Sequence, residues 1–486
     1  MATPQVPSRA APIHPVSTPR PTQAATPAAK PSAKLSATLS LDLWTKDLPR
    51  EHGFEPLRVE GSLPPALRGT LYRNGPAQFG QFGRRYAHPF EGDGGVTAVR
   101  IADGAAMGAS RLTPSAGLLE ERAAGKQLYS TTASWLTRMS RQLRGRRKNT
   151  ANTSVVMWQG RLFALMEGGK PTELDPGDLS MIGETDLDGV IVDMFSAHPH
   201  RVESRHALYN FGIEMGRVNR LHLYELPDAG AARRLGSVEI GGATMVHDFI
   251  ATDSHLIFFV GPARFNLPGL LLGQSFDKLV KWRPELGTEV ICVPFDRPDA
   301  PVRFTTDAFY QWHFANAYRH GNELLVDYVR YPDFGTFDAM SDFARGHAGS
   351  ALEDGRYHRA RIDLVARTLV SEPLSDRPCE FPGVATGEAG YPHALTYLAF
   401  DDLGAIGSID ARGTIVSHEL PADERITEPL YVDGYLLALC HATDRAYVAV
   451  YDAARIPDGP VAKLWLDHHV PITFHGTFHS TPAATR

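Results

Sequence analysis

The feature that most constrains the fold of this chain is a long succession of short apolar runs separated by turn-forming residues. Each run has the length of a β-strand, and Gly, Pro, Asp or Asn follows nearly every one. Clear examples are Gly69–Arg73, Ser154–Trp158, Arg161–Met166, Leu256–Val260, Glu323–Val329 and Tyr447–Tyr451. Helical periodicity is scarce, and its clearest case is Ser134–Leu143, where four apolar residues can share one face. The pattern predicts an all-β fold, and a closed β-propeller is the economical architecture at this length. No sequence repeat is visible, so periodicity alone does not establish the propeller.

The first 38 residues differ from the rest because they are rich in Pro, Ala, Ser and Thr, with no acidic residue before Asp42. With few bulky apolar side chains they cannot offset the entropy lost on ordering, so we predict a disordered tail. The absence of an apolar segment argues against a signal peptide. A flexible tail is also a better interpretation than an organelle transit peptide, which the acid-free composition faintly resembles. Residues 39–486 then form a single propeller domain.

Composition narrows the class of protein further. The 486 residues are 43% hydrophobic and carry a net charge of −6, which argues against nucleic acid as a partner. No apolar run is long enough to span a bilayer. Three widely spaced cysteines, Cys292, Cys379 and Cys440, argue against a disulfide framework and favour a reducing compartment, the cytoplasm.

Four histidines stand beside aromatic or small residues and are separated by long gaps: His198, His247, His313 and His475. Such gaps exclude a zinc finger and a helical HExxH motif. A radial fold could supply one ligand from each of several blades. Taken singly, each histidine is more simply interpreted as an ordinary core or surface residue, so the neighbouring motifs have to decide.

Those motifs resemble the carotenoid cleavage oxygenase family from about residue 42 to residue 478. The matching blocks, in the family's order, include Gly69–Pro76, Phe90–Gly94, Ala151–Thr153, Ala164–Gly169, Leu174–Pro176, the four histidine segments, Glu380–Pro382 and Glu428–Pro429. The resemblance implies a seven-bladed β-propeller with a helical and loop cap over an iron site on the propeller axis. It also implies an iron(II)-dependent dioxygenase that uses O2 to cleave a carbon–carbon double bond of a carotenoid or apocarotenoid, giving retinal-like aldehydes.

The resemblance assigns roles residue by residue. His198, His247, His313 and His475 match the metal ligands, and Glu167, Glu380 and Glu428 match the carboxylates that orient them. Thr153 matches a threonine whose methyl group stands near an open coordination position, although an ordinary strand threonine is an equal interpretation. Three more histidines near the ligands, His200, His320 and His479, are interpreted as surface or second-sphere residues. The segment after Glu428 is shorter than is usual in the family, which makes the match there less secure.

This set of residues suits the chemistry. Neutral imidazoles bind iron(II) well, and without a carboxylate ligand the ion keeps its full charge. Each ring must present one lone pair, so its other nitrogen needs an acceptor, which a buried glutamate supplies. Three glutamates can orient three rings. The metal supplies the oxidative chemistry, and the protein orients one double bond.

Several alternatives stay open. Stilbene-cleaving relatives carry a lysine and a tyrosine where this chain has Met166 and Leu118, so an apolar polyene is favoured over a lignostilbene-type substrate. A retinoid isomerase, a non-catalytic propeller scaffold and a zinc hydrolase are weaker interpretations.

Two segments predict contact with a membrane, where carotenoids reside. Phe265–Leu272 is an apolar stretch, and Ser134–Lys148 is a basic amphipathic segment. Together they could form a docking patch on a cytoplasmic, peripherally bound protein. Core packing is the alternative for the first, and a solvated basic face for the second.

Overall fold

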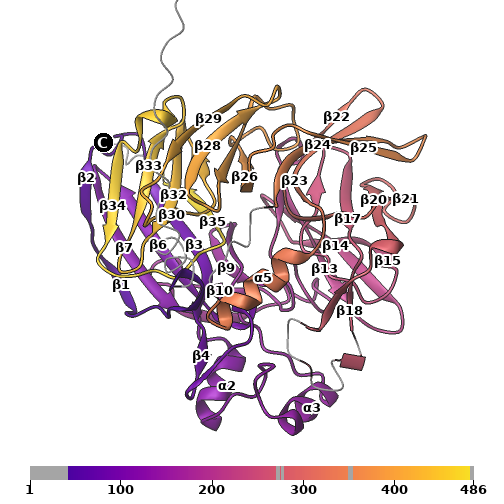
Figure 1. Cartoon of the computed structure of the whole chain (residues 1–486), viewed down its shortest axis with the longest axis horizontal. Coiled ribbons are helices and arrows are strands. Elements are labelled where there is room, and N and C mark those ends of the chain that lie inside the picture. Colours follow the sequence, from indigo (N-terminus) through magenta and orange to yellow (C-terminus); the bar gives the residue numbers. More distant parts are fainter. Residues whose placement is uncertain (1–41, 267, 270–273, 275–277, 348–353, 482–486) are drawn as a thin grey trace, which may run out of the picture.

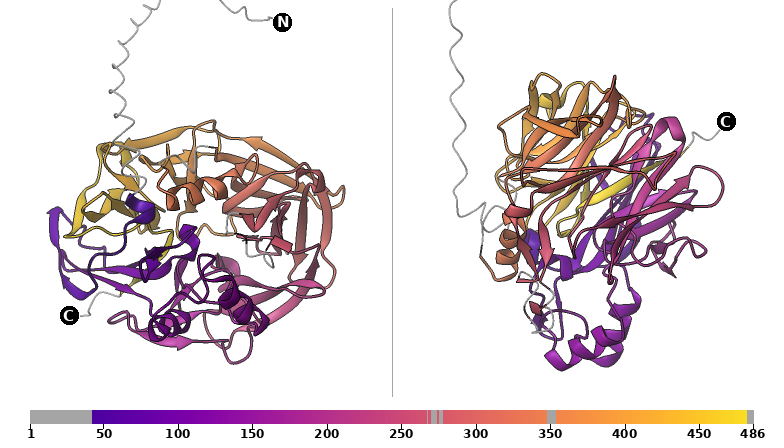
Figure 2. Two further views of the ribbon diagram at one scale, coloured as in Figure 1. Left: turned by 60° about the horizontal axis from the view of Figure 1, so that its bottom comes forward. Right: turned by 90° about the vertical axis from the view of Figure 1, so that its right-hand side faces the viewer.

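Seven antiparallel sheets stand in a ring about a central axis (Figures 1 and 2). The computed structural model describes residues 42–266, 268–269, 274, 278–347 and 354–481. The predicted seven-bladed β-propeller is therefore confirmed, whereas the prediction of a disordered tail over residues 1–38 lies outside the described residues.

The blades are as follows, in the order in which the strands pair. The first is β1 (His52–Pro56), β7 (Ala105–Leu112), β6 (Asp93–Ala102), β3 (Gly69–Gln78) and β35 (His475–Ser480). The second is β11 (Met181–Glu184), β10 (Thr172–Leu174), β9 (Arg161–Leu165) and β8 (Ser154–Trp158), and the third is β12 (His200–Val202), β13 (Ala207–Glu214), β14 (Asn219–Pro227) and β15 (Arg233–Ile240). The fourth is β16 (Ile250–Ala251), β17 (His255–Val260), β20 (Thr288–Pro294) and β21 (Val302–Thr306), and the fifth is β22 (Tyr310–His320), β23 (Glu323–Tyr331), β24 (Arg356–Asp363) and β25 (Thr368–Pro373). The sixth is β26 (Cys379–Val384), β27 (Leu395–Phe400), β28 (Ala405–Asp410) and β29 (Ile415–Glu419). The seventh is β2 (Arg58–Gly61), β34 (Ala462–Leu466), β33 (Ala446–Asp452), β32 (Tyr435–His441) and β30 (Arg425–Ile426), with β31 (Leu430–Val432) also on β32. Two small ribbons, β4 (Gly80–Gln81) with β5 (Arg84–Arg85) and β18 (Ala263–Phe265) with β19 (Val280–Trp282), lie outside the blades.

Burial along the strands follows from the stacking of blades face to face. Middle strands such as β17, β32 and β33 are buried on both faces, which explains why they read as continuous apolar runs in the sequence. Outer strands such as β25 and β29 contain no buried residue. The core consequently consists of apolar layers between neighbouring blades, for example Leu439 and Val448 against Val99.

The ring closes by pairing the two ends of the described chain. Strand β35 lies antiparallel to β3, with Gly69 opposite Ser480 and Asn74 opposite His475. Strand β2 pairs with β34 in the last blade. This closure brings His475, late in the sequence, against residues more than 300 positions earlier.

Helices gather on one side of the propeller and form the predicted cap (Figures 1 and 2). Helix α2 (Ala116–Ala124) begins at Ser115, whose hydroxyl accepts a hydrogen bond from Leu118 N, and ends at Gly125 in the left-handed conformation. Helix α3 (Trp135–Leu143) corresponds to the one helix predicted from periodicity. Helix α5 (Gly335–Ala344) packs against the 3-10 turn η1 (Pro89–Glu91), with Phe337 stacked on His88 at 4.5 Å between ring centroids.

Two expectations from composition can be compared with the fold. Within the described residues, no helix is both long and apolar enough to cross a membrane. All three cysteines are buried and free.

Candidate metal centre

All eight predicted site residues lie on or next to the strands that line the propeller axis. His313 and Glu380 are in β22 and β26, and His475 is the first residue of β35. Thr153, His198, His247 and Glu428 lie just before β8, β12, β16 and β31, and Glu167 follows β9. Because each blade presents its inner strand to the axis, residues from all seven blades converge on one point.

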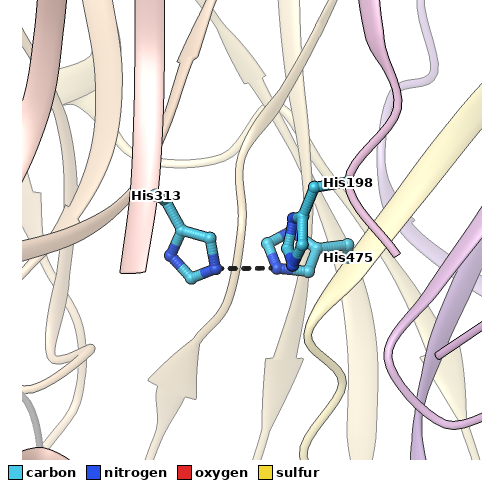
Figure 3. Close-up of side chains that lie close together, drawn as sticks. All are labelled: His198, His313 and His475. Atoms are coloured by element: carbon cyan, nitrogen blue, oxygen red, sulfur yellow. Dashed lines mark hydrogen bonds between the residues drawn. The ribbon is translucent and has the colours of Figure 1, made fainter. Parts of the chain in front are cut away.

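The four histidine rings form one buried cluster, three of which are drawn in Figure 3. The Nε2 atoms of His313 and His475 are 3.0 Å apart, and those of His247 and His313 are 3.4 Å apart. The ring centroid of His198 lies 4.3 Å from that of His247 and 4.7 Å from that of His475. The structure therefore brings together all four histidines that the motifs singled out.

The three glutamates lie behind these rings. His313 Nδ1 is 2.6 Å from Glu380 Oε2, and His475 Nδ1 is 2.9 Å from Glu428 Oε1. Glu167 Oε1 is 2.9 Å from His247 Nδ1 and 3.7 Å from His198 Nε2. His198 Nε2 is buried without a hydrogen-bond partner.

This pattern of donors leaves lone pairs facing one another. A carboxylate only accepts hydrogen bonds, so the Nδ1 atoms of His313 and His475 carry the protons and their Nε2 atoms are acceptors. Two acceptors at 3.0 Å repel unless a cation lies between them. A proton can satisfy one such pair, but His247 directs a third nitrogen to the same point. Among the described residues, two groups of three side chains could each hold one ion: His198, His313 and His475, and Glu167, His198 and His247. The arrangement fits a metal ion.

The electrostatics agree with this interpretation. Burial lowers the pKa of His198 to about 4, and burial together with the neighbouring His313 lowers the pKa of His475 well below its ordinary value. Burial alone would raise the pKa of Glu167, but its contacts with His198 and His247 hold that pKa well below the usual range. Burial opposes charge on His313 too, yet the Glu380 carboxylate raises its pKa. The neutral rings of His198 and His475 and the ionised Glu167 suit a dipositive ion.

Two supporting residues were missed by sequence reasoning. Arg73, which is 1% exposed, donates to Glu428 Oε2 at 2.6 Å and to the carbonyl of Phe474 at 2.8 Å. The Tyr331 hydroxyl donates to Glu380 Oε1 at 2.9 Å. Arg73 lies inside the Gly69–Pro76 motif. An arginine among apolar strand residues is a signal that it pairs with a buried carboxylate.

An apolar cavity lies beside the cluster and encloses about 430 Å³ of empty space, counting its opening. Thr153, His247, His313, Glu380 and His475 form its polar end. The remaining lining is aromatic or apolar: Trp44, Phe90, Trp312, Met340, Phe381 and Phe474. An aromatic cavity that is also lined by converging imidazoles can hold an apolar molecule against a bound metal.

The other predicted residues fall in different places. The Thr153 hydroxyl lies 3.2 Å from Asn152 Oδ1 and 3.3 Å from Glu167 Oε2. His320 and His479 are exposed, whereas His200 contacts Asp248. Met166 and Leu118, which were compared with the lysine and tyrosine of stilbene-cleaving relatives, are not among the described residues that line the cavity, and Leu118 is fully buried in α2. The choice of substrate class therefore rests on the lining and not on those two positions.

Comparison with known proteins agrees with the fold and the site. The family model described as retinal pigment epithelial membrane protein matches residues 46–480. The chain belongs to this family. The expected resemblance to the carotenoid oxygenases is thereby confirmed.

Relatives of this family member are named as oxygenases. Apocarotenoid-15,15′-oxygenase of Synechocystis sp. is 31% identical over 476 residues, covering 90% of this chain and 94% of that protein. Isoeugenol monooxygenase of Pseudomonas nitroreducens is 26% identical over 460 residues, covering 88% and 95%. Among solved structures, a variant of the Synechocystis apocarotenoid oxygenase has a TM-score of 0.84 at 30% identity, covering 92% of this chain and 99% of that one. A cobalt-substituted form of that enzyme has a TM-score of 0.82 at 28% identity, with the same coverage of each chain. The prediction of an oxygenase agrees with these names.

Proposed function

We propose that this protein is an iron(II)-dependent dioxygenase that cleaves a carbon–carbon double bond of a carotenoid or apocarotenoid into two aldehydes. His198, His247, His313 and His475 would hold the iron, which supplies the activation of O2 when bound. The observation that carries the proposal is the convergence of unprotonated imidazole nitrogens at the end of an aromatic cavity. The relationship to the apocarotenoid oxygenase of Synechocystis supports the choice of substrate.

The chain's own residues would have three tasks in this reaction. Glu167, Glu380 and Glu428 keep the ring protons on the far side of the imidazoles, so that lone pairs face the metal. The aromatic lining binds the polyene and excludes water, and its shape selects which double bond lies over the site. Because the hydroxyl of Thr153 is directed to Asn152 and Glu167, its methyl group remains to narrow access to the metal.

The test is anaerobic loading with iron(II), followed by exposure to air with a β-apocarotenal in detergent and mass spectrometry of the products. Two shorter aldehydes, lost in His313→Ala and retained in the exposed-residue control His479→Ala, are the expected result. Intact substrate with a full complement of bound iron would refute the carotenoid assignment.

An aryl alkene is the second candidate substrate, since one relative is an isoeugenol monooxygenase. The same aromatic lining would accept a ring-bearing alkene. Isoeugenol and a hydroxystilbene therefore belong in the same assay, and rapid turnover of either with none of the apocarotenal would favour this alternative.

We further propose that the protein is cytoplasmic and docks on membranes through the cap. Three apolar side chains of the α3 helix are exposed: Trp135 by 52%, Leu136 by 73% and Leu143 by 82%. Arg138 on α3 donates to the carbonyl of Gln274 at 3.1 Å, two residues after the apolar segment predicted from the sequence. Of that segment, Phe265–Leu272, half of the residues lie outside the described part of the chain.

The basic residues after α3 contribute less positive charge than the sequence suggested. Arg141 and Arg146 pair with Glu120, and Arg147 pairs with Asp193. Lys148 is buried between Asp93 and Glu121. Apolar insertion is therefore the main expected contribution.

Flotation with liposomes tests this docking. Leu136→Glu with Leu143→Glu should abolish co-flotation. Val365→Glu, at a position 88% exposed on the propeller, should not. Undiminished binding of the α3 double variant would contradict the proposal.

A further inference from the structure

A buried carboxylate next to the histidine cluster has no role in the function proposed above. Asp248 follows His247 directly and is 1% exposed. Its Oδ1 atom accepts hydrogen bonds from Phe249 N at 2.8 Å and from His200 Nε2 at 2.7 Å. Its Oδ2 atom accepts one from Phe314 N at 2.9 Å. Every one of these donors is on the chain near a histidine of the cluster.

The partners of Asp248 link three separate blades. His200 begins β12 and is two residues after His198, with the rigid Pro199 between them. Phe314 is the neighbour of His313 in β22, and Asp248 itself is joined to His247 just before β16. A single carboxylate therefore fixes the distances between the backbone segments that carry three of the four histidines.

The local backbone explains why such a link is needed. The pairing of β22 with β23 is irregular between Gln311 and Phe314 and again between Phe314 and Asn316. His313 lies within this irregular stretch, where the ladder alone does not define the direction of its side chain. The hydrogen bond from Phe314 N to Asp248 anchors this irregular stretch of β22 to the neighbouring blade.

We propose that Asp248 is a positioning residue for the metal centre, acting with His200 as its hydrogen-bonded partner. It touches none of the four rings through a hydrogen bond, unlike Glu380 and Glu428, and acts on them through the backbone. His475 is held independently, because its glutamate is fixed by Arg73. The proposal rests on the metal site proposed above and assigns the geometry of three ligands to one side chain.

Asp327 provides a matched control. It is also 1% exposed and carries a similar set of partners, Arg359 at 2.7 Å and His393 at 3.2 Å, in the same blade as His313. None of its side-chain partners is next to a cluster histidine. Loss of its charge should lower stability without disturbing the cluster.

The experiment measures cobalt(II) binding to the metal-free protein by absorption spectroscopy, since the cobalt bands report ligand geometry as well as affinity. In Asp248→Asn, one of the two carboxylate oxygens becomes an NH2 group, which cannot accept the hydrogen bonds that this oxygen accepts in the wild type. His200→Leu removes the imidazole donor. Both should weaken cobalt(II) binding about 10- to 100-fold and alter the bands. His200→Gln, which restores a donor at the position of Nε2, should recover much of the affinity, and Asp327→Asn should bind like the wild type. Urea unfolding of each metal-free variant records the loss of stability separately.

Wild-type affinity and an unchanged spectrum in Asp248→Asn would overturn the proposal. The proposal would also be overturned if Asp327→Asn weakened cobalt(II) binding as much as Asp248→Asn does, at the same loss of unfolding free energy. Failure of the wild type to bind cobalt(II) would overturn this proposal and the proposed metal centre together. Binding with the expected variant pattern but no cleavage of any alkene would overturn the proposed function alone.

Discussion

Replacement of Arg73 by methionine tests how the His475 side of the metal centre is held. Arg73 is 1% exposed and makes hydrogen bonds to Glu428 Oε2 at 2.6 Å, to Thr427 Oγ1 at 3.2 Å and to the carbonyl of Phe474 at 2.8 Å. Methionine fills much of the same volume but carries no charge. The substitution therefore leaves the Glu428 side chain without its buried cation.

Removal of one member of a buried ion pair costs about 3–5 kcal/mol. The Glu428 side chain is 16% exposed and still accepts hydrogen bonds from His475 Nδ1 and Gly476 N, both at 2.9 Å. These contacts favour the lower end, about 3 kcal/mol of unfolding free energy for the metal-free protein. If this loss of unfolding free energy comes from the Arg73–Glu428 pair itself, the two single changes should not be additive. The double variant Arg73→Met with Glu428→Gln should then lose about 2 kcal/mol less unfolding free energy than the sum of the two single losses.

The assay is urea unfolding of the four metal-free proteins, together with the iron content of each after anaerobic loading. Arg73→Met should also retain less iron, because the carboxylate that orients His475 is no longer fixed. Arg359→Met is the control: it breaks another buried pair, to Asp327 at 2.7 Å, and should lower stability without lowering iron content. An additive cycle with wild-type iron content in Arg73→Met would refute the reasoning.

Three further outcomes are expected. In Gly94→Ala the new Cβ would lie 2.1 Å from the carbonyl oxygen of Ala151, so the urea midpoint should fall by an amount equivalent to at least about 2 kcal/mol. Gly241→Ala, which meets no atom within 4 Å, should leave that midpoint unchanged. Burial lowers the pKa of His441 to about 3, so the stability that its neutral ring contributes is present above the unfolded-state value near 6.5 and is lost as the pH falls toward the folded value. Between about pH 7 and about pH 5, the unfolding free energy of His441→Gln in urea titrations should therefore fall by about 2 kcal/mol less than that of the wild type. Equal losses would contradict the expected pH dependence. The three cysteines are buried, and burial raises the pKa of each thiol, so Ellman's reagent should modify none of them in the native protein and all three in denaturant.

The strands were predictable because a blade strand leaves a local trace in the sequence. Ser154–Trp158 coincides with β8, and the apolar run Leu256–Val260 lies within β17. Helix α3 was predictable from its period, whereas α2 and α5 were missed because their buried residues are few or are mixed with charged ones. The number of blades followed from the family resemblance, since no repeat in the sequence reports it.

The candidate site divides in the same way. Its four histidines and three glutamates were found because each lies in a short motif, and the structure brings all seven together. Arg73, Tyr331 and Asp248 were missed because their partners are distant in sequence, whereas His200 was interpreted as a surface or second-sphere residue.

The sequence by itself therefore determined the strand-rich fold and the identity of the histidines, since each depends on residue type and local pattern. Only the tertiary structure decided which carboxylate faces which ring, that the Lys148 side chain is buried and not part of a basic surface, and that Leu118 is not among the described residues that line the cavity. The reason is physical. Closure of the ring by β3 and β35 joins residues that are hundreds of positions apart, and the pairing of buried charges is settled only when that closure fixes their distances.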